Sequence, residues 1–118
     1  MREIKFRGWD KELNFMIDIK RYKIDFNGQV LFDNNDKELY NQTNKIELMQ
    51  YAGLKDINGV EIYEGDYLLD GHSGGWGEVK FYKGAFIVEF GNEIQDLYDW
   101  TYECVIGNIY ENPELLKR

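Results

Sequence analysis

Apolar and polar residues alternate along most of the chain. At the start, Ile4 and Phe6 fall on one face of an extended segment, and Glu3, Lys5 and Arg7 fall on the other. A period of two is typical of a β-strand with one buried face. Similar patterns predict further strands over residues 15–19, 22–26, 30–32, 60–62, 67–69, 79–82, 86–90 and 104–110, and a weaker strand over residues 46–51.

Turn signals separate these strands. Asn27-Gly28 and Asn58-Gly59 each predict a two-residue hairpin turn, because asparagine and glycine accept the positive φ angles that such turns need. Lys83-Gly84 predicts another turn. Residues 33–38 predict a polar loop, and residues 92–102 are ambiguous between a short helical turn and an irregular edge.

Short strands joined by tight turns predict a mainly β protein. We expect a single domain over residues 1–118, with antiparallel hairpins in residues 1–60 packed as a layer on residues 61–118. In the second part, a strand, a Gly-rich loop, a hairpin, an irregular connection and a final strand favour an SH3-like small barrel. Asn112-Pro113 then predicts a short C-terminal helix.

Charge is distributed unevenly along the chain, whose net charge is −8. Residues 1–60 contain ten Lys or Arg and ten Asp or Glu, whereas residues 61–118 contain four basic and twelve acidic residues. A negative field of this kind repels phosphate backbones and anionic membranes. The acidic part therefore serves solubility, offers a surface to a basic partner or mimics nucleic acid.

The chain has no apolar run of signal-peptide or membrane-spanning length. Cys104 is its only cysteine, which excludes an internal disulfide and fits a reducing compartment. We therefore expect a cytoplasmic protein with no membrane partner.

The segment from Leu48 to Asp70 concentrates carboxylates, tyrosines and glycines. A calcium loop of the EF-hand type that began at Asp56 would need Gly at its sixth position and Glu at its twelfth, where the chain has Glu61 and Tyr67. This excludes that metal site. A pair of catalytic carboxylates is weakly indicated, because 22 of the 118 residues are acidic and such pairs arise by chance. Turn chemistry needs no further assumption, so we interpret the segment as scaffold.

Other catalytic and cofactor chemistry is sparse. His72, Ser73 and Cys104 are each the only residue of their type, and one His with one Cys cannot complete a four-ligand zinc site without several carboxylates. The Gly-rich loop at residues 71–77 lacks the Lys and the following helix of a phosphate-binding loop. We expect a protein that is not an enzyme and has no metal or cofactor. The least unsuitable catalytic candidates are Glu64, Asp66 and His72.

Basic residues are concentrated in the first part of the chain, where they lie among aromatic ones. Aromatic rings can stack on bases, and Lys and Arg can bind phosphates. A buried core with a solvated strand face accounts for the same residues. The candidate nucleic-acid face consists of Arg2, Lys5, Arg7, Lys20, Arg21 and Lys23.

Three segments, MREIKFRGWDKE (residues 1–12), LMQYAGLKDINGVEIYEGDYL (48–68) and VIGNIYENPELL (105–116), resemble the YopX family. Its members are small proteins encoded mostly by bacteriophages and prophages. The family more often has Thr where this chain has Ala52, and residues 14–45 and 91–102 carry little of the pattern. We interpret the family-signature hairpin as structural; its residues are Tyr51, Gly53, Leu54, Asp56, Asn58, Gly59, Ile62, Tyr63, Gly65 and Asp66.

The resemblance implies a mainly β fold with a barrel-like C-terminal part, and it implies no catalytic residue and no particular reaction. It also implies a phage or prophage accessory protein that acts in the host cytoplasm through binding. We favour a protein-interaction module with a phage or host protein as partner, or with further copies of itself. A nucleic-acid-binding protein that uses the basic N-terminal strand and an acidic nucleic-acid mimic or host-factor inhibitor are the alternatives.

Overall fold

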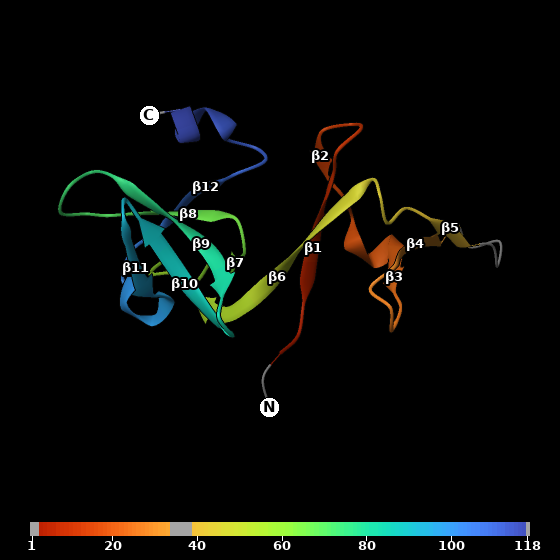
Figure 1. The fold of residues 1–118 in the computed structure, drawn as a ribbon, viewed down its shortest axis with the longest axis horizontal. Coiled ribbons are helices and arrows are strands. Elements are labelled where there is room, and N and C mark those ends of the chain that lie inside the picture. The colour runs from red at the N-terminus through yellow and green to blue at the C-terminus, as the bar shows by residue number, and fades with distance from the viewer. Residues whose placement is uncertain (1–2, 34–38, 118) are drawn as a thin grey trace. The chain divides into compact units, whose positions relative to one another are not determined.

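The computed structural model describes residues 3–33 and 39–117 and confirms a mainly β protein with antiparallel sheets and almost no helix (Figure 1). Contacts divide the chain into two compact units: Phe6–Met49, which we call the N-terminal unit, and Met1–Lys5 with Gln50–Arg118, the C-terminal unit. In order, the strands and 3-10 helices (η) are β1 Phe6–Asp10, β2 Phe15–Met16, η1 Ile19–Arg21, β3 Tyr22–Ile24, β4 Val30–Asp33, β5 Leu39–Asn41, β6 Ile46–Lys55, β7 Glu61–Tyr63, β8 Asp66–Leu69, β9 Trp76–Tyr82, β10 Ala85–Phe90, β11 Glu93–Asp96, η2 Leu97–Trp100, β12 Val105–Asn108 and η3 Pro113–Lys117.

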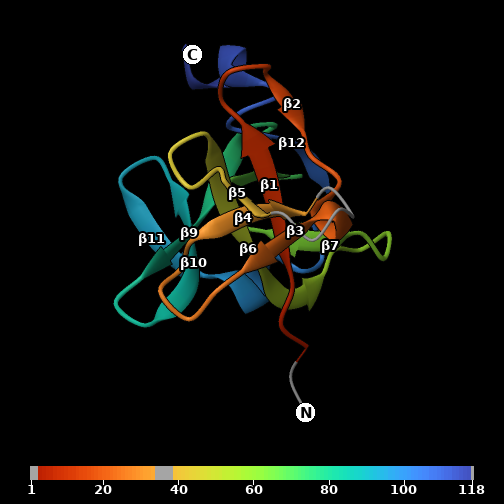
Figure 2. The same cartoon turned by 90° about the vertical axis from the view of Figure 1, so that its right-hand side faces the viewer.

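The N-terminal unit contains two small antiparallel arrangements. Strand β1 pairs with β2, and β3, β4 and β5 form a three-stranded sheet in chain order (Figure 2). Its core is built around Ile17, Val30 and Ile46, which are all buried. Burial of branched apolar side chains supplies the main driving force for a unit of this size.

The C-terminal unit is built on a five-stranded antiparallel sheet in the order β11-β10-β9-β8-β12, which forms a half-barrel. The last strand, β12, pairs with the first, β8, with Asn108 opposite Asp66. In Figure 1 these strands run from green (β8) to blue (β12). The part of β6 from Gln50 onward belongs to the same unit and pairs with β7.

One face of this sheet carries the core of the C-terminal unit. Leu68, Val79 and Val88, from three neighbouring strands, are completely buried together with Ile62 of β7. The face is so closely packed at β9 that a Cβ atom added to Gly77 would collide with Val88. The residues of β8, β9 and β10 that alternate with this set lie on the opposite face of the sheet.

The strand predictions are largely confirmed, with instructive differences. The segment predicted as a strand over residues 15–19 is a two-residue strand that runs into η1, and β5 was not predicted. The ambiguous residues 92–102 form β11 and then η2. Asp96 is the N-cap of η2, and its side chain accepts the Tyr98 N–H at 2.9 Å. After Asn112 the chain forms the 3-10 helix η3. Residues 34–38 of the predicted polar loop lie outside the described residues.

The prediction of a two-residue turn at Asn58-Gly59 is wrong. The Asp56 N–H donates to the Val60 carbonyl at 2.8 Å, so three residues lie inside the loop, and Gly59 takes the left-handed position with φ +81°. The reason is Asp56, whose Oδ1 accepts the N–H groups of Asn58 and Val60, both at 2.8 Å. An aspartate at this position stabilises the three-residue loop from inside.

The turn at Asn27-Gly28 was mispredicted for the same reason. Asp25 Oδ1 accepts the N–H groups of Asn27 at 2.9 Å and Gln29 at 2.8 Å, and Gly28 has φ +78°. The two loops share the pattern Asp-X-Asn-Gly-X, once in each unit. By contrast, Lys83-Gly84 is a two-residue turn, with φ values of +49° and +83° between the paired residues Tyr82 and Ala85.

No helix within residues 3–33 and 39–117 combines the length and the apolar character that a membrane crossing requires.

Candidate functional site

The family-signature hairpin is part of the core of the C-terminal unit. Ile62 is completely buried in that core, and Leu54 packs against it. On another face of the hairpin, Tyr51 of β6 pairs with Tyr63 of β7, with ring centroids 5.6 Å apart. Gly53, at φ +84°, lies where the register between β6 and β7 shifts. The hairpin is thus positioned by packing along its whole length.

Asp56 connects the hairpin loop to the sheet. Its side chain is 6% exposed, and while Oδ1 closes the loop, Oδ2 accepts the N–H of Val105 at 2.9 Å. Beside it, the Ile57 N–H donates to the Glu103 carbonyl at 3.1 Å. A buried carboxylate with three backbone donors is well compensated for its loss of water. These contacts support the interpretation of the signature as scaffold.

The second acidic turn is built in a similar way. Asp66 is 1% exposed, and its Oδ2 accepts the Tyr63 N–H at 2.8 Å. Gly65 takes φ +86°, and its N–H donates to the Val79 carbonyl at 2.8 Å. The turn thus ties the hairpin to strand β9.

The three candidate catalytic residues have different surroundings. Glu64 Oε1 accepts the Gln50 N–H at 2.9 Å, and Asp66 accepts the Tyr63 N–H, so each of these carboxylates has a structural hydrogen bond. His72 is exposed, in the loop after β8. Within the described part of the chain, no three His, Cys, Asp or Glu side chains form a group that could hold a metal ion.

Lys5 contacts the signature hairpin directly. Its ammonium pairs with Glu61 and, at 2.9 Å, with Glu3, and it lies 5.4 Å from the centre of the Tyr51 ring. The hydrogen bond from Lys5 lowers the pKa of Glu61, although burial of Glu61 opposes it. The hydrogen bonds to Glu61 and Glu3 raise the pKa of Lys5. Lys5 therefore has two carboxylate partners within its own unit.

The other candidate nucleic-acid residues lie in the N-terminal unit, except Arg2, which is outside the described residues. Arg7 Nε donates to Met49 Sδ at 3.4 Å, and the Arg21 guanidinium lies 5.0 Å from the centre of the Phe32 ring. Lys23 pairs with Asp33 at 3.3 Å, and Lys20 is exposed. Lys20 and Arg21 lie on η1, and Lys23 lies on the next element, β3.

A pocket that the sequence did not reveal lies on the C-terminal unit. It has a volume of about 450 Å³. Its lining comes from β8, β9, the end of β10 and η3, and comprises Tyr67, Gly75, Trp76, Glu78, Glu89, Phe90, Gly91 and Leu115. Alternation along β9 places Trp76 and Glu78 on the same face, but only the strand order brings β8, β9 and β10 together.

The sequence match extends over almost the whole chain. The family model described as YopX protein matches residues 5–117. The chain belongs to the YopX family. No curated protein matched this YopX-family chain.

Two solved structures share the fold of this YopX-family chain. The crystal structure of protein EF1440 from Enterococcus faecalis has 30% sequence identity and a TM-score of 0.69, and the match covers 98% of this chain and 99% of that one. The X-ray structure of protein yopX from Bacillus subtilis has 26% identity and a TM-score of 0.64, with 98% of each chain covered. The YopX fold therefore includes both the N-terminal and the C-terminal unit.

The contacts of Asp56 generate a stability prediction. We expect Asp56→Ala to lower the free energy of unfolding by at least about 3 kcal/mol, because it removes three hydrogen bonds to a buried carboxylate. Asp25→Ala, in the more exposed loop with the same pattern, should cost only about 1 kcal/mol. Urea denaturation followed by tryptophan fluorescence measures both.

Asp56→Asn serves as a second variant if Asp56→Ala does not fold. It keeps an oxygen that can close the loop, so its stability should fall between those of the wild type and Asp56→Ala. Equal losses for the alanine variants at Asp25 and Asp56 would show that the contact with Val105 contributes nothing.

The pair of Lys5 and Glu61 generates a pH prediction. Because the folded-state pKa of Glu61 is lowered, its ionised form adds stability above the unfolded-state pKa, and this contribution disappears as the pH falls through the folded-state pKa. Glu61→Gln should therefore be slightly less stable than the wild type at pH 7, and the difference should vanish in acid.

Urea midpoints measured from pH 7 down to pH 3 test this expectation. Glu47→Gln, which breaks the exposed pair with Lys11 at 3.1 Å, controls for the loss of one negative charge. A difference for Glu61→Gln that stays constant across the titration would contradict the assigned role of the ion pair.

Proposed function

We propose that this YopX-family chain is a non-enzymatic protein-interaction module, an accessory protein of a phage or prophage that acts in the bacterial cytoplasm. The observation that carries the proposal is a set of aromatic residues at the turn between β9 and β10. We call Phe81, Tyr82 and Phe86 the hairpin-tip aromatics. Phe81 is 54% exposed and Tyr82 is 45% exposed.

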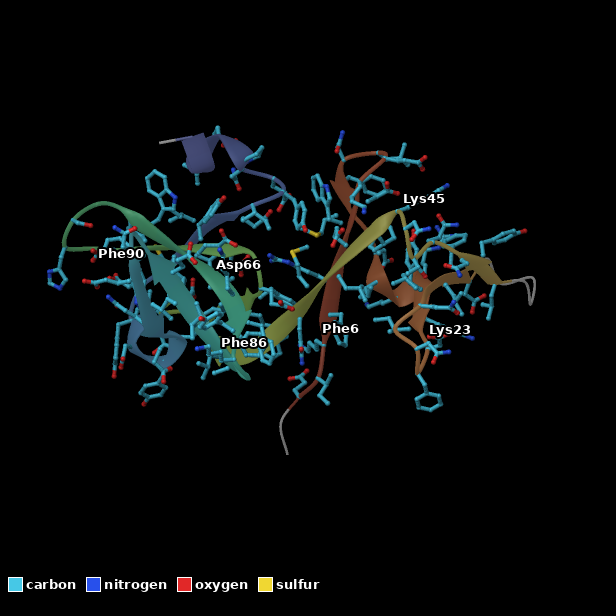
Figure 3. All side chains as sticks on the ribbon, in the orientation of Figure 1. Phe6, Lys23, Lys45, Asp66, Phe86 and Phe90 are labelled. Carbon is cyan, nitrogen blue, oxygen red and sulfur yellow. The ribbon has the colours of Figure 1, made fainter. Side chains whose placement is uncertain are left out.

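Two of the hairpin-tip aromatics, Phe81 and Phe86, pack against each other before any partner binds. Phe81 and Phe86 face each other across the two strands, with ring centroids 5.1 Å apart in an edge-on arrangement. Phe86 also packs against the core of the C-terminal unit; Figure 3 shows it near the start of β10, with Phe90 at the other end. Exposed aromatic side chains that are already ordered supply contact area at a low entropic cost, which is why protein interfaces are enriched in them.

The charge distribution supports a partner with a basic surface. All of the excess negative charge lies in residues 61–118, but it surrounds this hairpin in sequence, because within the hairpin of β9 and β10 Glu78 and Glu89 are balanced by Lys80 and Lys83. Complementary charge steers association and selects the partner, while buried aromatic groups provide most of the affinity.

We place the hairpin on an SH3-like small barrel. The pairing of the last strand β12 with the first strand β8, after the 3-10 helix η2, supports this assignment. Strands β9 and β10 are inner strands of this sheet, so recognition through the hairpin uses its exposed side chains and not a free strand edge.

The proposal is tested by affinity capture of the tagged protein from phage-bearing cells, with and without nuclease. We expect a stoichiometric protein partner that survives nuclease and is lost with the double variant Phe81→Ser, Tyr82→Ser. Phe26→Ser is the matched control, because Phe26 is a fully exposed aromatic residue in a hairpin loop of the other unit.

Two results would overturn the proposal. Retention of the partner by the double variant would remove the hairpin-tip aromatics from the interface. Recovery of nucleic acid, with the partners lost on nuclease treatment, would favour the basic residues Lys20, Arg21 and Lys23 instead. Solution mass across a concentration series tests self-association, since the monomer has a mass of 14.1 kDa.

A further inference from the structure

The pocket of the C-terminal unit contains a row of polar side chains that crosses three strands. Glu89 of β10 lies opposite Glu78 of β9, and Glu78 lies opposite Tyr67 of β8. All three line the pocket, on the face of the sheet that alternates with the core residues. Trp76 and Phe90 form aromatic parts of the wall, and Leu115 of η3 contributes an apolar part.

Tyr67 is the unusual member of this row. It is 1% exposed, and its hydroxyl group has no hydrogen-bond partner within the part of the chain that the structure describes. Burial raises the pKa of the hydroxyl, and Glu78 and Glu114 raise it further. A buried hydroxyl without a partner is costly, so such a group at the wall of a pocket indicates that a ligand supplies the missing partner.

Of the two glutamates, Glu78 is the one without an ion-pair partner among the described residues. Like charges directly opposite each other on neighbouring strands destabilise a sheet. Glu89 pairs with Lys80 at 3.2 Å, whereas Glu78 is half-buried and has no ion pair among residues 3–33 and 39–117. Burial raises the pKa of Glu78. The attraction of Lys80 opposes this shift, and the repulsion from Glu89 adds to it. A positive charge in the pocket would relieve this repulsion.

The residues that line the pocket favour one class of cation, a primary ammonium. Carboxylates and a tyrosine oxygen accept hydrogen bonds, and the face of a tryptophan attracts cations. A primary ammonium offers three N–H donors to these acceptors, and its alkyl chain can pack against Phe90 and Leu115. Carboxylates repel anions, and the described residues contain no cluster suited to a metal ion.

We infer that this pocket binds a primary alkylammonium group, with Glu78 as its counter-ion, Tyr67 as a hydrogen-bond acceptor and Trp76 as an aromatic wall. The group comes either from a free amine or from a lysine side chain of another protein. The inference does not depend on the hairpin-tip aromatics, which belong to a different part of the sheet.

The test is a titration of the full chain with n-butylammonium chloride, followed by nuclear magnetic resonance of the amides of Gly75 and Gly91 and the indole of Trp76. We expect saturable shifts that weaken as salt rises. An equal concentration of 1-butanol, which has the same alkyl chain without the charge, should give none. The tripeptide acetyl-Gly-Lys-Gly-amide, against the same peptide with norleucine, separates the two sources of the group.

Three variants assign the residues. Glu78→Gln should weaken binding at least about tenfold, because it removes a charge-assisted hydrogen bond. Tyr67→Phe should weaken binding about threefold or more and leave the stability of the free protein unchanged or higher, since its hydroxyl has no partner. Asp99→Asn, an exposed acidic residue outside the pocket lining, should change the affinity by less than about twofold and controls for net charge.

The outcomes are decisive in both directions. Binding of both butylammonium and the lysine peptide assigns a protein lysine, and binding of butylammonium alone assigns a small amine. Shifts that 1-butanol reproduces, or that Glu78→Gln and Tyr67→Phe leave unchanged, overturn the inference. A loss of stability in Tyr67→Phe would also overturn it, because the hydroxyl would then have a structural partner. Affinity capture tests the hairpin-tip aromatics and the titration tests the pocket, so either proposal can fail without the other.

Discussion

The C-terminal unit depends on the carboxylate of Asp56. One oxygen closes the loop of the family-signature hairpin, and the other accepts the N–H of Val105, at the start of the last strand of the sheet. The side chain thereby joins two segments that are 49 residues apart. Ile62 of the same hairpin is buried in the core, so both polar and apolar contacts hold the hairpin in position. The carboxylate of Asp56 therefore has a structural role in this unit.

Much of the fold could be predicted, because a period of two survives in most of the strands. Phe86 to Phe90 shows it clearly, since one face meets the core. The prediction failed where a side chain, rather than the backbone pattern, decides the conformation. Asp25 and Asp56 convert two Asn-Gly turns into longer loops, and the signal, an aspartate two residues before the asparagine, was present in the sequence. The cap at Asp96 likewise resolves a segment without clear periodicity.

The pocket could not be predicted, because its chemistry depends on strand register. Tyr67, Glu78 and Glu89 are separated by eleven residues at each step and carry no motif. They meet because β9 pairs with both β8 and β10, and a shift by one residue would move Glu78 to the core face. The pair of Lys5 and Glu61 has the same origin, since 56 residues separate its partners. The sequence supplied the residue types, and the sheet determined which of them are neighbours.

The pairing of β12 with β8 has a consequence for the order of folding. While the chain is synthesised, β8, β9 and β10 can pair as soon as they emerge, because they are consecutive. The edge of β8 and the second oxygen of Asp56 have no native partner until Val105 has been synthesised. A nascent chain at this stage has an open strand edge, which favours association with other chains. This unit can therefore complete its sheet only after the segment that contains Val105 has been synthesised.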